Sequence, residues 1–357
     1  MKAAVVEQKG GPFELRELEL GPLRADEVLV RVVAAGICHT DLICRDQWLP
    51  VPLPAVLGHE GAGVVEAVGE AVTEFAPGDR VGMSYDFCGA CPACERGLPV
   101  YCHAFFEHNF AAARPEDTSS VLGDVHAHFF GQSSFATHAV ARERNLVLLP
   151  DDVPFEIAAP FGCGIQTGAG AVLNALRPQA GSSFAVFGAG AVGLAAVMAA
   201  RAVGCTKIVA VDLRPRRLEL ARELGATQIV DASTEDPVDV VGATMDFSLE
   251  VTGSPAAIRQ AIDVLAPLGT CGIVGAPAVG TEASFDVTFV MTAGRTIRGI
   301  VEGESRPKEF LAQLFELWRR GALPVERMIS YYDFDDIDRA VRDAESGDAI
   351  KPVLRIG

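Results

Sequence analysis

Residues 173–299 repeat one pattern, in which a short apolar run is followed by a stretch with helical periodicity. Segments such as PRRLELARELG stand between most of the apolar runs. Strands that alternate with helices are typical of parallel sheets, because the chain must cross the face of the sheet before it can add a parallel neighbour. The six runs that we interpret as strands are SFAVF, KIVAV, TQIV, DFSLEV, GTCGIV and TIRGIV. The pattern therefore predicts an α/β fold with a doubly wound parallel sheet.

The segments on either side of this sheet have a different character. Up to about residue 140, short alternating runs such as EVLVRVVAAG and GAGVVEAVG are broken by Gly and Pro, which indicates a β-rich region. After the sheet we expect helices near FLAQLFELWRRG and DIDRAVRDAESG and a last strand, KPVLRI. This last stretch is too short to fold alone. The predicted division is a β-rich domain of residues 1–164 and 300–357 and a sheet domain of residues 165–299.

Length and charge narrow the class of protein. A chain of 357 residues with 49 % hydrophobic and 22 % charged residues is long enough for two globular domains. Its 47 acidic residues outnumber its 30 basic ones, which gives a formal net charge of -17. This charge repels phosphate backbones and anionic membranes, and no Lys/Arg cluster reverses it locally. We therefore expect neither nucleic acid nor a membrane as a partner.

The N-terminus and the cysteines bear on the compartment. MKAAVVEQKGG turns polar too early for a secretory signal, and the longest apolar run, residues 184–200, is interrupted by glycines and falls short of a membrane span. Nine cysteines in a chain without an export signal indicate reduced thiols that serve as ligands. We expect a cytoplasmic protein.

The motif GAGAVG at residues 188–193 matches the dinucleotide-binding fingerprint. It follows the strand SFAVF and opens the helix LAAVMAARA, which is the context that the motif requires. The first glycine permits a tight turn, the second lets the backbone approach a pyrophosphate, and the third allows close packing of the helix. The alternative is a glycine turn that binds nothing. We expect the cofactor phosphates at Gly188, Gly190, Ala191, Val192 and Gly193.

Asp212 ends the second strand, 19 residues beyond Gly193. A carboxylate there accepts hydrogen bonds from the adenosine ribose hydroxyls and repels a 2′-phosphate, so NAD is favoured over NADP. Arg214, two residues later, would partly offset that repulsion and keeps NADP open as an alternative.

The segment CGACPACERGLPVYC supplies Cys88, Cys91, Cys94 and Cys102, with two, two and seven residues between them. Four thiolates without an open position predict a closed, structural zinc site. One alternative is a loop of four thiols without metal. Another is a nucleic-acid zinc finger, which conflicts with the acidic charge and with Arg96 as the one basic residue inside the segment.

Three further residues suit a second zinc site: Cys38, His59 in GHEGAGVVEAVG, and Cys163 in PFGCGIQTGAG. Two thiolates and an imidazole leave the fourth position open, and this ligand set is the one known from alcohol dehydrogenase. Together with the four-cysteine segment and the late GAGAVG, these residues resemble the zinc-dependent medium-chain alcohol dehydrogenases over essentially the whole chain. CHTDLICRDQ, VPLPAVLGHEGAG and CGIQTGAGAV are most similar to the aryl (benzyl) alcohol dehydrogenases.

The resemblance implies a GroES-like catalytic domain, a Rossmann domain, and two zinc ions per chain. It also implies an NAD-dependent enzyme that interconverts primary aromatic alcohols and aldehydes. The catalytic zinc would bind the alcohol oxygen and lower its pKa, and hydride would pass to C4 of the nicotinamide. The near alternative is a geraniol, terpene or general medium-chain primary alcohol dehydrogenase. A nucleotide-binding relative without turnover is a further alternative, although all three types of catalytic ligand are retained.

By the same resemblance, single residues receive roles. Thr40 would hydrogen-bond the substrate oxygen and receive its proton, Asp41 would orient His59, and Glu60 would lie near the zinc. Ile43 is a departure, because many relatives carry there a histidine that passes the proton to water. Cys44 is interpreted as a small buried side chain. Further cofactor contacts are implied at His39, Thr167, Arg217, Val251, Val274 and Lys351.

The substrate pocket is assigned by resemblance alone to Trp48, Leu49, Phe129, Phe130 and Ile300. Phenylalanines gather within residues 103–135, and the alternative is that they form ordinary core. An apolar wall suits a benzylic or allylic alcohol better than ethanol. No basic cluster suited to an anionic thiol adduct is present, which disfavours the glutathione-dependent formaldehyde enzymes. The resemblance also implies a homodimer or homotetramer that associates through the strand near TIRGIV.

Overall fold

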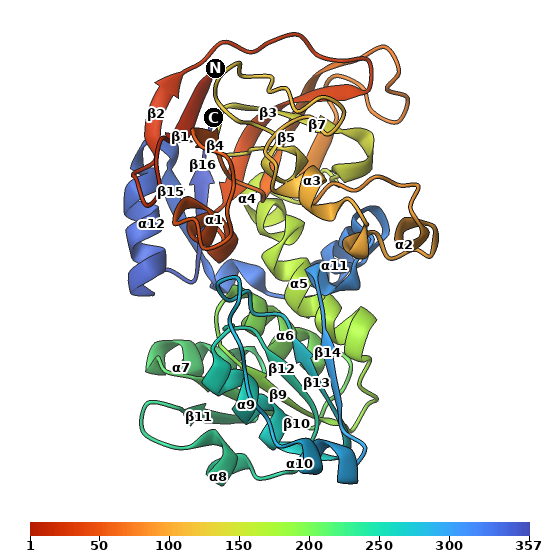
Figure 1. The fold of residues 1–357 in the computed structure, drawn as a ribbon, viewed down its shortest axis with the longest axis vertical. Coiled ribbons are helices and arrows are strands. Elements are labelled where there is room, and N and C mark those ends of the chain that lie inside the picture. The colour runs from red at the N-terminus through yellow and green to blue at the C-terminus, as the bar shows by residue number, and fades with distance from the viewer. The chain divides into compact units, whose positions relative to one another are not determined.

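The structure, a computed structural model, describes residues 1–357 and divides them into two compact units (Figure 1). Unit 1 comprises Met1–Cys163, Arg306–Glu316 and Val325–Gly357, and unit 2 comprises Gly164–Ser305 and Leu317–Pro324. The chain thus remains in unit 2 a few residues beyond 299 and returns to it briefly at Leu317–Pro324, an excursion that the sequence did not indicate.

Unit 2 is built on a six-stranded parallel sheet in the order β11-β10-β9-β12-β13-β14. The chain runs outward from β9 to β11 and then returns to the other side of β9 with β12, so the strand order reverses there. At such a reversal the carboxyl ends of the strands open a crevice that binds ligands. The bounds are β9 (Ser183–Phe187), β10 (Lys207–Asp212), β11 (Gln228–Asp231), β12 (Met245–Glu250), β13 (Leu265–Ile273) and β14 (Thr296–Gly299).

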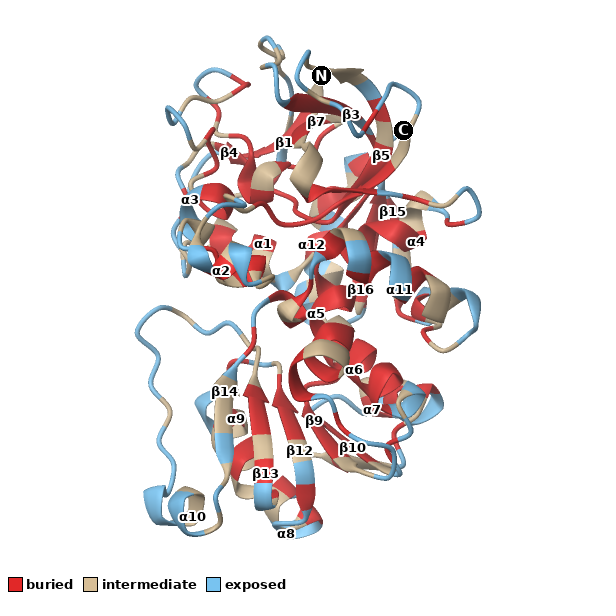
Figure 2. Ribbon diagram, turned by 90° about the vertical axis from the view of Figure 1, so that its right-hand side faces the viewer, coloured by how far each residue is buried: buried red, intermediate tan, exposed pale blue.

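The helices of unit 2 differ in how far they are buried (Figure 2). Helix α6 is almost entirely apolar and is buried from Gly193 to Ala200, as expected of a helix packed within the unit, whereas α10 has no buried residue. Helix α5 continues into a wider π-helical turn, η5 (Ala171–Leu176). The bounds are α5 (Gly164–Gly170), α6 (Ala191–Ala202), α7 (Pro215–Leu224), α8 (Pro237–Val241), α9 (Pro255–Asp263) and α10 (Val287–Thr292).

Unit 1 contains a seven-stranded sheet in the order β15-β16-β3-β5-β6-β8, with β7 also paired to β3, and a small sheet in the order β2-β1-β4. Strand β3 is buried along most of its length because it pairs with β16, β5 and β7. The bounds are β1 (Lys2–Val6), β2 (Glu14–Glu17), β3 (Glu27–Gly36), β4 (Ala55–Val56), β5 (Gly61–Val68), β6 (Arg80–Met83), β7 (His138–Arg142), β8 (Leu146–Leu148), β15 (Ile329–Asp333) and β16 (Lys351–Arg355).

The helices of unit 1 are mostly short. They are α1 (His39–Arg45), α2 (Pro92–Glu95), α3 (Phe105–Asn109), α4 (Phe155–Ala158), α11 (Pro307–Arg319) and α12 (Ile337–Ser346), with 3-10 turns η1 (Pro99–Tyr101), η2 (Phe129–Gly131), η3 (Glu143–Asn145), η4 (Ala159–Gly162), η7 (Val325–Arg327) and η8 (Phe334–Asp336). The expected α/β class, with a β-rich part and a doubly wound sheet, is confirmed. None of the helices combines the length and the apolar character needed to span a bilayer.

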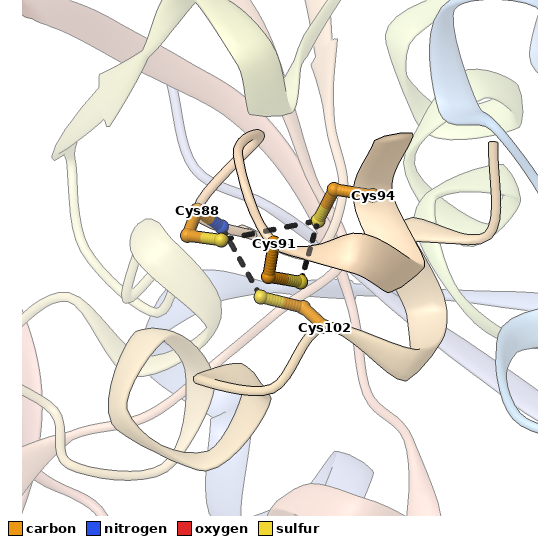
Figure 3. A group of neighbouring side chains, drawn as sticks. All are labelled: Cys88, Cys91, Cys94 and Cys102. Carbon is orange, nitrogen blue, oxygen red and sulfur yellow. Dashed lines mark hydrogen bonds between the residues drawn. The ribbon is translucent and has the colours of Figure 1, made fainter. Parts of the chain in front are cut away.

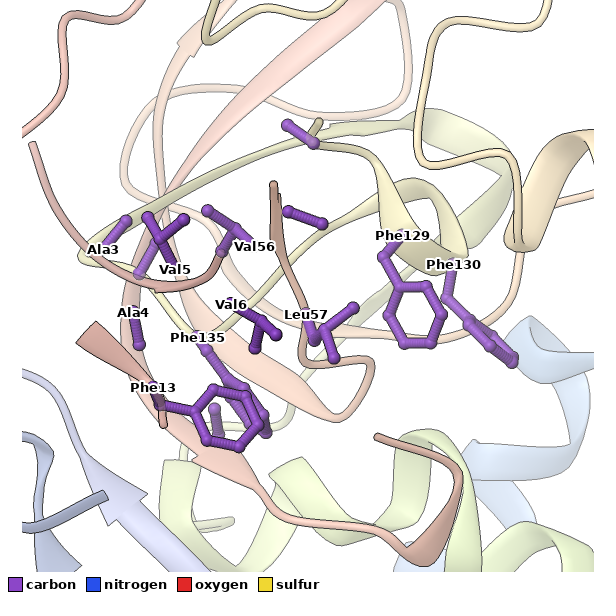
Figure 4. Close-up of a cluster of buried hydrophobic side chains, with 14 of the residues drawn as sticks. Ala3, Ala4, Val5, Val6, Phe13, Val56, Leu57, Phe129, Phe130 and Phe135 are labelled. Atoms are coloured by element: carbon purple, nitrogen blue, oxygen red, sulfur yellow. The ribbon is translucent and has the colours of Figure 1, made fainter. Parts of the chain in front are cut away.

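One apolar core of unit 1 joins the small sheet to the segment of residues 129–135, which carries three phenylalanines (Figure 4). The side chains of Val5 and Leu57 lie in the same buried cluster as Phe129, Phe130 and Phe135. The T-shaped contact of Phe13 with Phe135, at 5.7 Å between ring centroids, belongs to it. This core therefore fixes the segment on which Phe129 and Phe130 sit, directly beside the candidate catalytic residues described below.

Candidate active site and cofactor site

The turn between β9 and α6 carries the motif GAGAVG. Gly188 has a φ of 105°, which glycine adopts freely and other residues rarely do. A Cβ on Gly193 would lie 1.7 Å from the carbonyl oxygen of Gly188, so only glycine fits there. At Gly190 the nearest atom to a Cβ would be Arg217 Nη1, 3.9 Å away. The backbone at Gly190 is therefore open on the side from which a ligand can approach.

Helix α6 begins at Ala191, after the extended residue Gly190, and no side chain caps it. The first N–H groups of a helix have no partner within the helix, and the helix dipole adds partial positive charge there. Ala191 and Val192 thus present backbone donors at the carboxyl edge of β9. Donors at that place suit the pyrophosphate of a dinucleotide.

Asp212, the last residue of β10, lies beside this turn. Its Oδ2 accepts a hydrogen bond of 2.6 Å from the Ala189 backbone N–H, and its Oδ1 accepts one of 2.9 Å from Arg214 N–H. The guanidinium Nε of Arg217 is buried without a hydrogen-bond partner. Burial lowers the pKa of Arg217, and the charge of Asp212 opposes that shift. A half-buried guanidinium whose Nε has no hydrogen-bond partner, beside the glycine turn, suits an anionic ligand.

Three other predicted cofactor residues lie at the same edge of unit 2. Val251 follows β12, and its N–H donates to Phe187 O at 3.0 Å. Val274 follows β13, and its N–H donates to Glu250 O at 2.8 Å. Thr167 lies in α5 and is nearly buried. Val251 and Val274 therefore stand at the carboxyl ends of two neighbouring strands, β12 and β13.

The four cysteines of the lobe around α2 converge on one point (Figure 3). The sulfurs of Cys91 and Cys94 are 3.6 Å apart, those of Cys88 and Cys94 are 4.0 Å apart, and all four lie within 4.8 Å of one another. Four sulfurs placed tetrahedrally about 2.3 Å from a zinc ion are separated by about 3.8 Å. The arrangement, which includes Cys102, therefore fits a zinc ion without rearrangement.

The protonation of these thiols supports the same interpretation. The backbone N–H of His103 donates to Cys91 and lowers the pKa of that thiol to about 6. Burial raises the pKa of Cys94 to about 12 and also raises that of Cys102. Crowded thiolates repel one another, and a bound cation relieves the repulsion.

Cys38, His59 and Cys163 come together within unit 1. Cys38 precedes α1, His59 precedes β5 and Cys163 follows η4, yet their ligand atoms, together with a carboxylate oxygen of Glu60, lie within 4.8 Å of one another. The Cys163 thiol donates to Cys38 and lowers the pKa of Cys38 well below its ordinary value, against the effect of burial. A lowered pKa favours the thiolate form of Cys38, which is the form that binds a metal ion.

His59 is held by its backbone and by its ring. Its Nδ1 lies 2.8 Å from Asp41 Oδ1, and Asp41 also accepts hydrogen bonds from the N–H groups of Cys38 and Gly58 at 2.9 and 3.1 Å. Burial alone would lower the pKa of His59, but the charges of Asp41 and Cys38 raise it well above its ordinary value. Its Nε2 is buried without a partner. An imidazole fixed through one nitrogen and orphaned at the other fits a zinc ion.

Glu60 and Lys351 form a buried ion pair behind these ligands. Lys351 Nζ lies 2.9 Å from both carboxylate oxygens of Glu60 and donates to Ile37 O at 3.1 Å. A Cβ on Gly36 would lie 2.0 Å from Glu60 Oε2, so glycine leaves the space that the carboxylate occupies. Burial raises the pKa of Glu60, and Lys351 offsets part of that shift. Lys351, about 2 % exposed, thus lies beside the candidate zinc ligands in unit 1.

Helix α1 carries the other residues of the segment CHTDLICRDQ to which a role or an environment was assigned. The Thr40 hydroxyl lies 3.8 Å from Cys38 Sγ, and His39 is exposed. Ile43 and Cys44 are buried, and burial raises the pKa of the Cys44 thiol. No polar group stands at position 43.

The predicted pocket residues occupy different environments. The Phe130 ring stacks on the His59 imidazole at 4.5 Å between centroids, and Phe129 meets it edge-on at 5.7 Å. Both phenylalanines are buried, and Leu49 is partly buried, whereas Trp48 is 53 % exposed. Ile300 is buried in unit 2. Two of the five residues therefore contact a zinc-ligand candidate directly.

Sequence reasoning missed Gln132. Its Nε2 donates to His59 O at 3.0 Å and to Ser84 O at 3.2 Å, and its Oε1 accepts from Gly61 N–H at 3.0 Å. The side chain thus holds the backbone on both sides of Glu60. No local pattern marks Gln132, because its partners lie 48 to 73 residues away in the sequence.

Comparison with known families assigns the class. Residues 24–151 match the family described as alcohol dehydrogenase GroES-like domain, and residues 191–317 match the family described as zinc-binding dehydrogenase. These matches cover more than half of the chain. The protein belongs to the zinc-dependent medium-chain alcohol dehydrogenases, a family of oxidoreductases that uses a catalytic zinc, a structural zinc and NAD.

Individual relatives match nearly the whole chain. Geraniol dehydrogenase from Castellaniella defragrans is 45 % identical over 362 residues, which cover 99 % of this chain and 97 % of the relative. The crystal structure of benzyl alcohol dehydrogenase from Acinetobacter calcoaceticus is 49 % identical with a TM-score of 0.97, covering 100 % of this chain and 99 % of the other. An alcohol dehydrogenase zinc-binding domain protein from Burkholderia ambifaria is 51 % identical with a TM-score of 0.96, covering 100 % and 98 %.

The family membership predicted from the motifs is therefore confirmed, as are the GroES-like and Rossmann-type parts of the fold. The expected cofactors, zinc and NAD, are those of the family. The relatives include enzymes named for an aromatic alcohol and for a terpene alcohol.

Proposed function

We propose that this enzyme interconverts primary aromatic alcohols and their aldehydes with NAD. The observation that carries the proposal is the contact of the buried Phe129 and Phe130 rings with the imidazole of His59, which makes the surroundings of the residue set that suits the catalytic zinc aromatic. An aryl ring next to the reacting carbon would meet such a surface favourably. The likeness to the benzyl alcohol dehydrogenase structure supports the same choice.

In this proposal Cys38, His59 and Cys163 hold the catalytic zinc, and Cys88, Cys91, Cys94 and Cys102 hold the structural zinc. When bound, the catalytic zinc supplies a Lewis acid that polarises the substrate oxygen. Thr40 supplies the hydroxyl that accepts the proton of the alcohol and returns it in the reverse reaction. Asp41 fixes the tautomer of His59, so that Nε2 carries the lone pair.

Glu60 and Lys351 set the charge behind the ligands. Two thiolates and a carboxylate concentrate negative charge in a buried site, and Lys351 compensates part of it. We assign Lys351 to this role. The phosphate and adenosine contacts then come from the glycine turn, Asp212 and Arg217. Val251, Val274 and Thr167 are proposed for the nicotinamide side of the crevice.

Ile43 excludes one route by which the proton of the alcohol could reach water. A histidine at this place would accept the proton from the hydroxyl and pass it to water, and an isoleucine side chain has no atom that can do so. We propose that the proton leaves through water or another base. The pH dependence of turnover should accordingly differ from that of relatives with the histidine.

A terpene alcohol is the second candidate substrate. The geraniol dehydrogenase of Castellaniella defragrans matches 99 % of this chain. An allylic alcohol is planar and apolar next to the reacting carbon, as a benzylic alcohol is, so the same phenylalanines would accept both.

A panel of alcohols with NAD, followed at the nicotinamide absorbance, tests the proposal. We expect kcat/KM to fall in the order benzyl alcohol, geraniol, hexanol, with NAD preferred to NADP. A geraniol value above that of benzyl alcohol would transfer the assignment to the terpene enzymes. Equal or better turnover with NADP would contradict the role given to Asp212.

We also propose that the enzyme is a homodimer or homotetramer joined through β14, and that it acts in the cytoplasm. Strand β14 is an edge strand of its sheet, and the neighbouring segments expose Leu268, Val287 and Met291. An exposed sheet edge next to apolar side chains suits a contact between subunits. Light scattering tests this, and a monomer at micromolar concentration would contradict it. The free thiols of the nine cysteines are consistent with a reducing compartment.

A further inference from the structure

Three residues beyond the end of β14 the backbone of unit 2 enters a run of three consecutive residues with positive φ. The angles are 45° at Glu302, 62° at Gly303 and 48° at Glu304. Residues with a Cβ rarely adopt this conformation, and it persists only where surrounding contacts hold it in place. Two of the three residues are glutamates, whose side chains can make the contacts that hold this conformation.

Glu302 is buried, about 9 % exposed, and points at helix α5. Its Oε2 accepts hydrogen bonds of 3.2 Å from both Gln166 Nε2 and Thr167 Oγ1. Ser305 then donates from its hydroxyl to Gln166 Oε1 at 2.9 Å. A Cβ on Gly303 would lie 2.4 Å from Gln166 O, so the segment and the helix are in backbone contact. The left-handed turn therefore serves to bring one carboxylate onto Thr167.

The place of this contact in the sheet is informative. Glu302 lies beyond the carboxyl end of β14, in the half of the sheet formed by β12, β13 and β14. A doubly wound sheet binds one mononucleotide over each half. The glycine turn after β9 and Asp212 at the end of β10 are proposed for the adenosine half, so the nicotinamide belongs over the half that contains Glu302. Helix α5 also touches the start of α6, because a Cβ on Gly168 would lie 2.0 Å from Val192 O.

We propose that Glu302 is a positioning residue of the nicotinamide half, which fixes the Thr167 hydroxyl and favours the oxidised cofactor over the reduced one. The proposal rests on the use of NAD by this enzyme. An ionised carboxylate can only accept, so the hydroxyl hydrogen of Thr167 is committed to Glu302 and its oxygen is left as an acceptor. A cofactor group that meets Thr167 must then donate, as the amide N–H of a carboxamide or a ribose hydroxyl does.

The charge of Glu302 acts in addition to its geometry. The oxidised nicotinamide ring is cationic and the reduced ring is neutral, while the rest of the cofactor is unchanged. A buried carboxylate on that side of the crevice is poorly screened by water, so it attracts the cationic ring and has little effect on the neutral one. Glu250 is a second buried acid at this edge, and its Oε1 and Oε2 accept from the backbone N–H groups of its own turn, at Thr252 and Gly253. Any charge that Glu250 contributes is the same in the wild type and in the Glu302 variants.

Binding of NAD+ and NADH to the zinc-loaded, full-length enzyme tests the proposal. For E302Q, which keeps the shape and removes the charge, we expect the Kd for NAD+ to rise about five- to tenfold more than the Kd for NADH. E302D is the matched control, because it keeps the charge and shortens the reach. It should weaken both forms alike and leave the ratio of the two Kd values near that of the wild type. The readouts are isothermal titration for NAD+ and nicotinamide fluorescence for NADH.

A purely structural role for Glu302 predicts a different result. If E302Q raises the Kd values for NAD+ and NADH to the same extent, or raises neither, the proposed effect of the charge is overturned. T167V provides a second test that leaves the carboxylate in place: it should weaken both forms, and T167S should restore them. Wild-type affinity for both forms in T167V would overturn the positioning role. If the wild type itself binds neither NAD+ nor NADH, the proposed function fails rather than this inference.

Discussion

Asp41 shows how much one side chain can organise. Its carboxylate accepts hydrogen bonds from the backbone N–H groups of Cys38 and Gly58, and it also lies within hydrogen-bond distance of His59 Nδ1. Two ligand candidates that are 21 residues apart in the sequence are thereby tied to one carboxylate. Sequence reasoning reached Asp41 through the resemblance, because a carboxylate close to the first ligand has a recognised role. It could not reach Gln132, whose partners are set only by the folded chain.

Ile43 offers a test at the scale of one residue. I43H should still fold and bind zinc, and it should change the pH profile of kcat/KM for benzyl alcohol, because an imidazole titrates near neutrality. Ile43 is buried in α1, so the imidazole should lower the free energy of unfolding by about 1–3 kcal/mol. I43L is the control and should keep the wild-type profile. Complete loss of activity in I43H with zinc still bound would contradict the role assigned to position 43.

His128 gives a prediction on pH. Burial lowers its pKa from the ordinary 6.5 to about 4. As the pH falls from about 6.5 to about 4, the unfolded chain binds a proton that the folded chain does not, so stability is lost over that window. Between pH 7 and pH 5 this one group should cost about 2 kcal/mol.

The variant H128N isolates that contribution. His128 has a φ of 69°, a conformation that asparagine tolerates better than most residues, and asparagine does not titrate. Urea unfolding at pH 7 and pH 5 should therefore show a smaller loss of stability for H128N than for the wild type. An equal loss in both proteins would show that His128 is protonated in the folded state at pH 5.

At the scale of elements, the strand order and pairing of unit 2 could be predicted from the sequence further than those of unit 1. The strands and crossovers of unit 2 follow from local periodicity, since each apolar run is a parallel strand, buried in β9, β10 and β12 and more exposed toward the edge strands β11 and β14, and the helices connect them. The pairing in unit 1 does not follow from periodicity. Strand β16, near the C-terminus, pairs with β3 near the N-terminus, and the register of an antiparallel pair depends on contacts over that distance.

Turns with unusual backbone are the other element that local patterns miss. Glu302 and Phe130 have positive φ although neither is glycine, because tertiary contacts hold them there. By contrast, the glycine turn after β9 was predictable, since glycine is the one residue type that fits the backbone at positions 188 and 193. Sequence reasoning therefore finds conformations that depend on residue type and misses those imposed by contacts.

At the scale of the whole molecule, the resemblance carried more than any single motif. Two zinc ligand sets, a dinucleotide fingerprint and their order along the chain together specified a family, and the family comparisons confirm it. The choice between aromatic and terpene alcohols depends on the shape of an apolar surface. The residues proposed to form that surface, Phe129 and Phe130, lie in the buried core cluster of unit 1, and by sequence they cannot be distinguished from ordinary core.

The central claim is that Cys38, His59 and Cys163 hold a catalytic zinc separate from the structural one. Zinc analysis of the purified wild type and of C163S, combined with NADH formation from benzyl alcohol, tests it most directly. We predict two zinc ions per chain in the wild type and one in a folded C163S, which should form no measurable NADH. A wild type with one zinc or none, or a C163S that holds one zinc and retains activity, would contradict the claim.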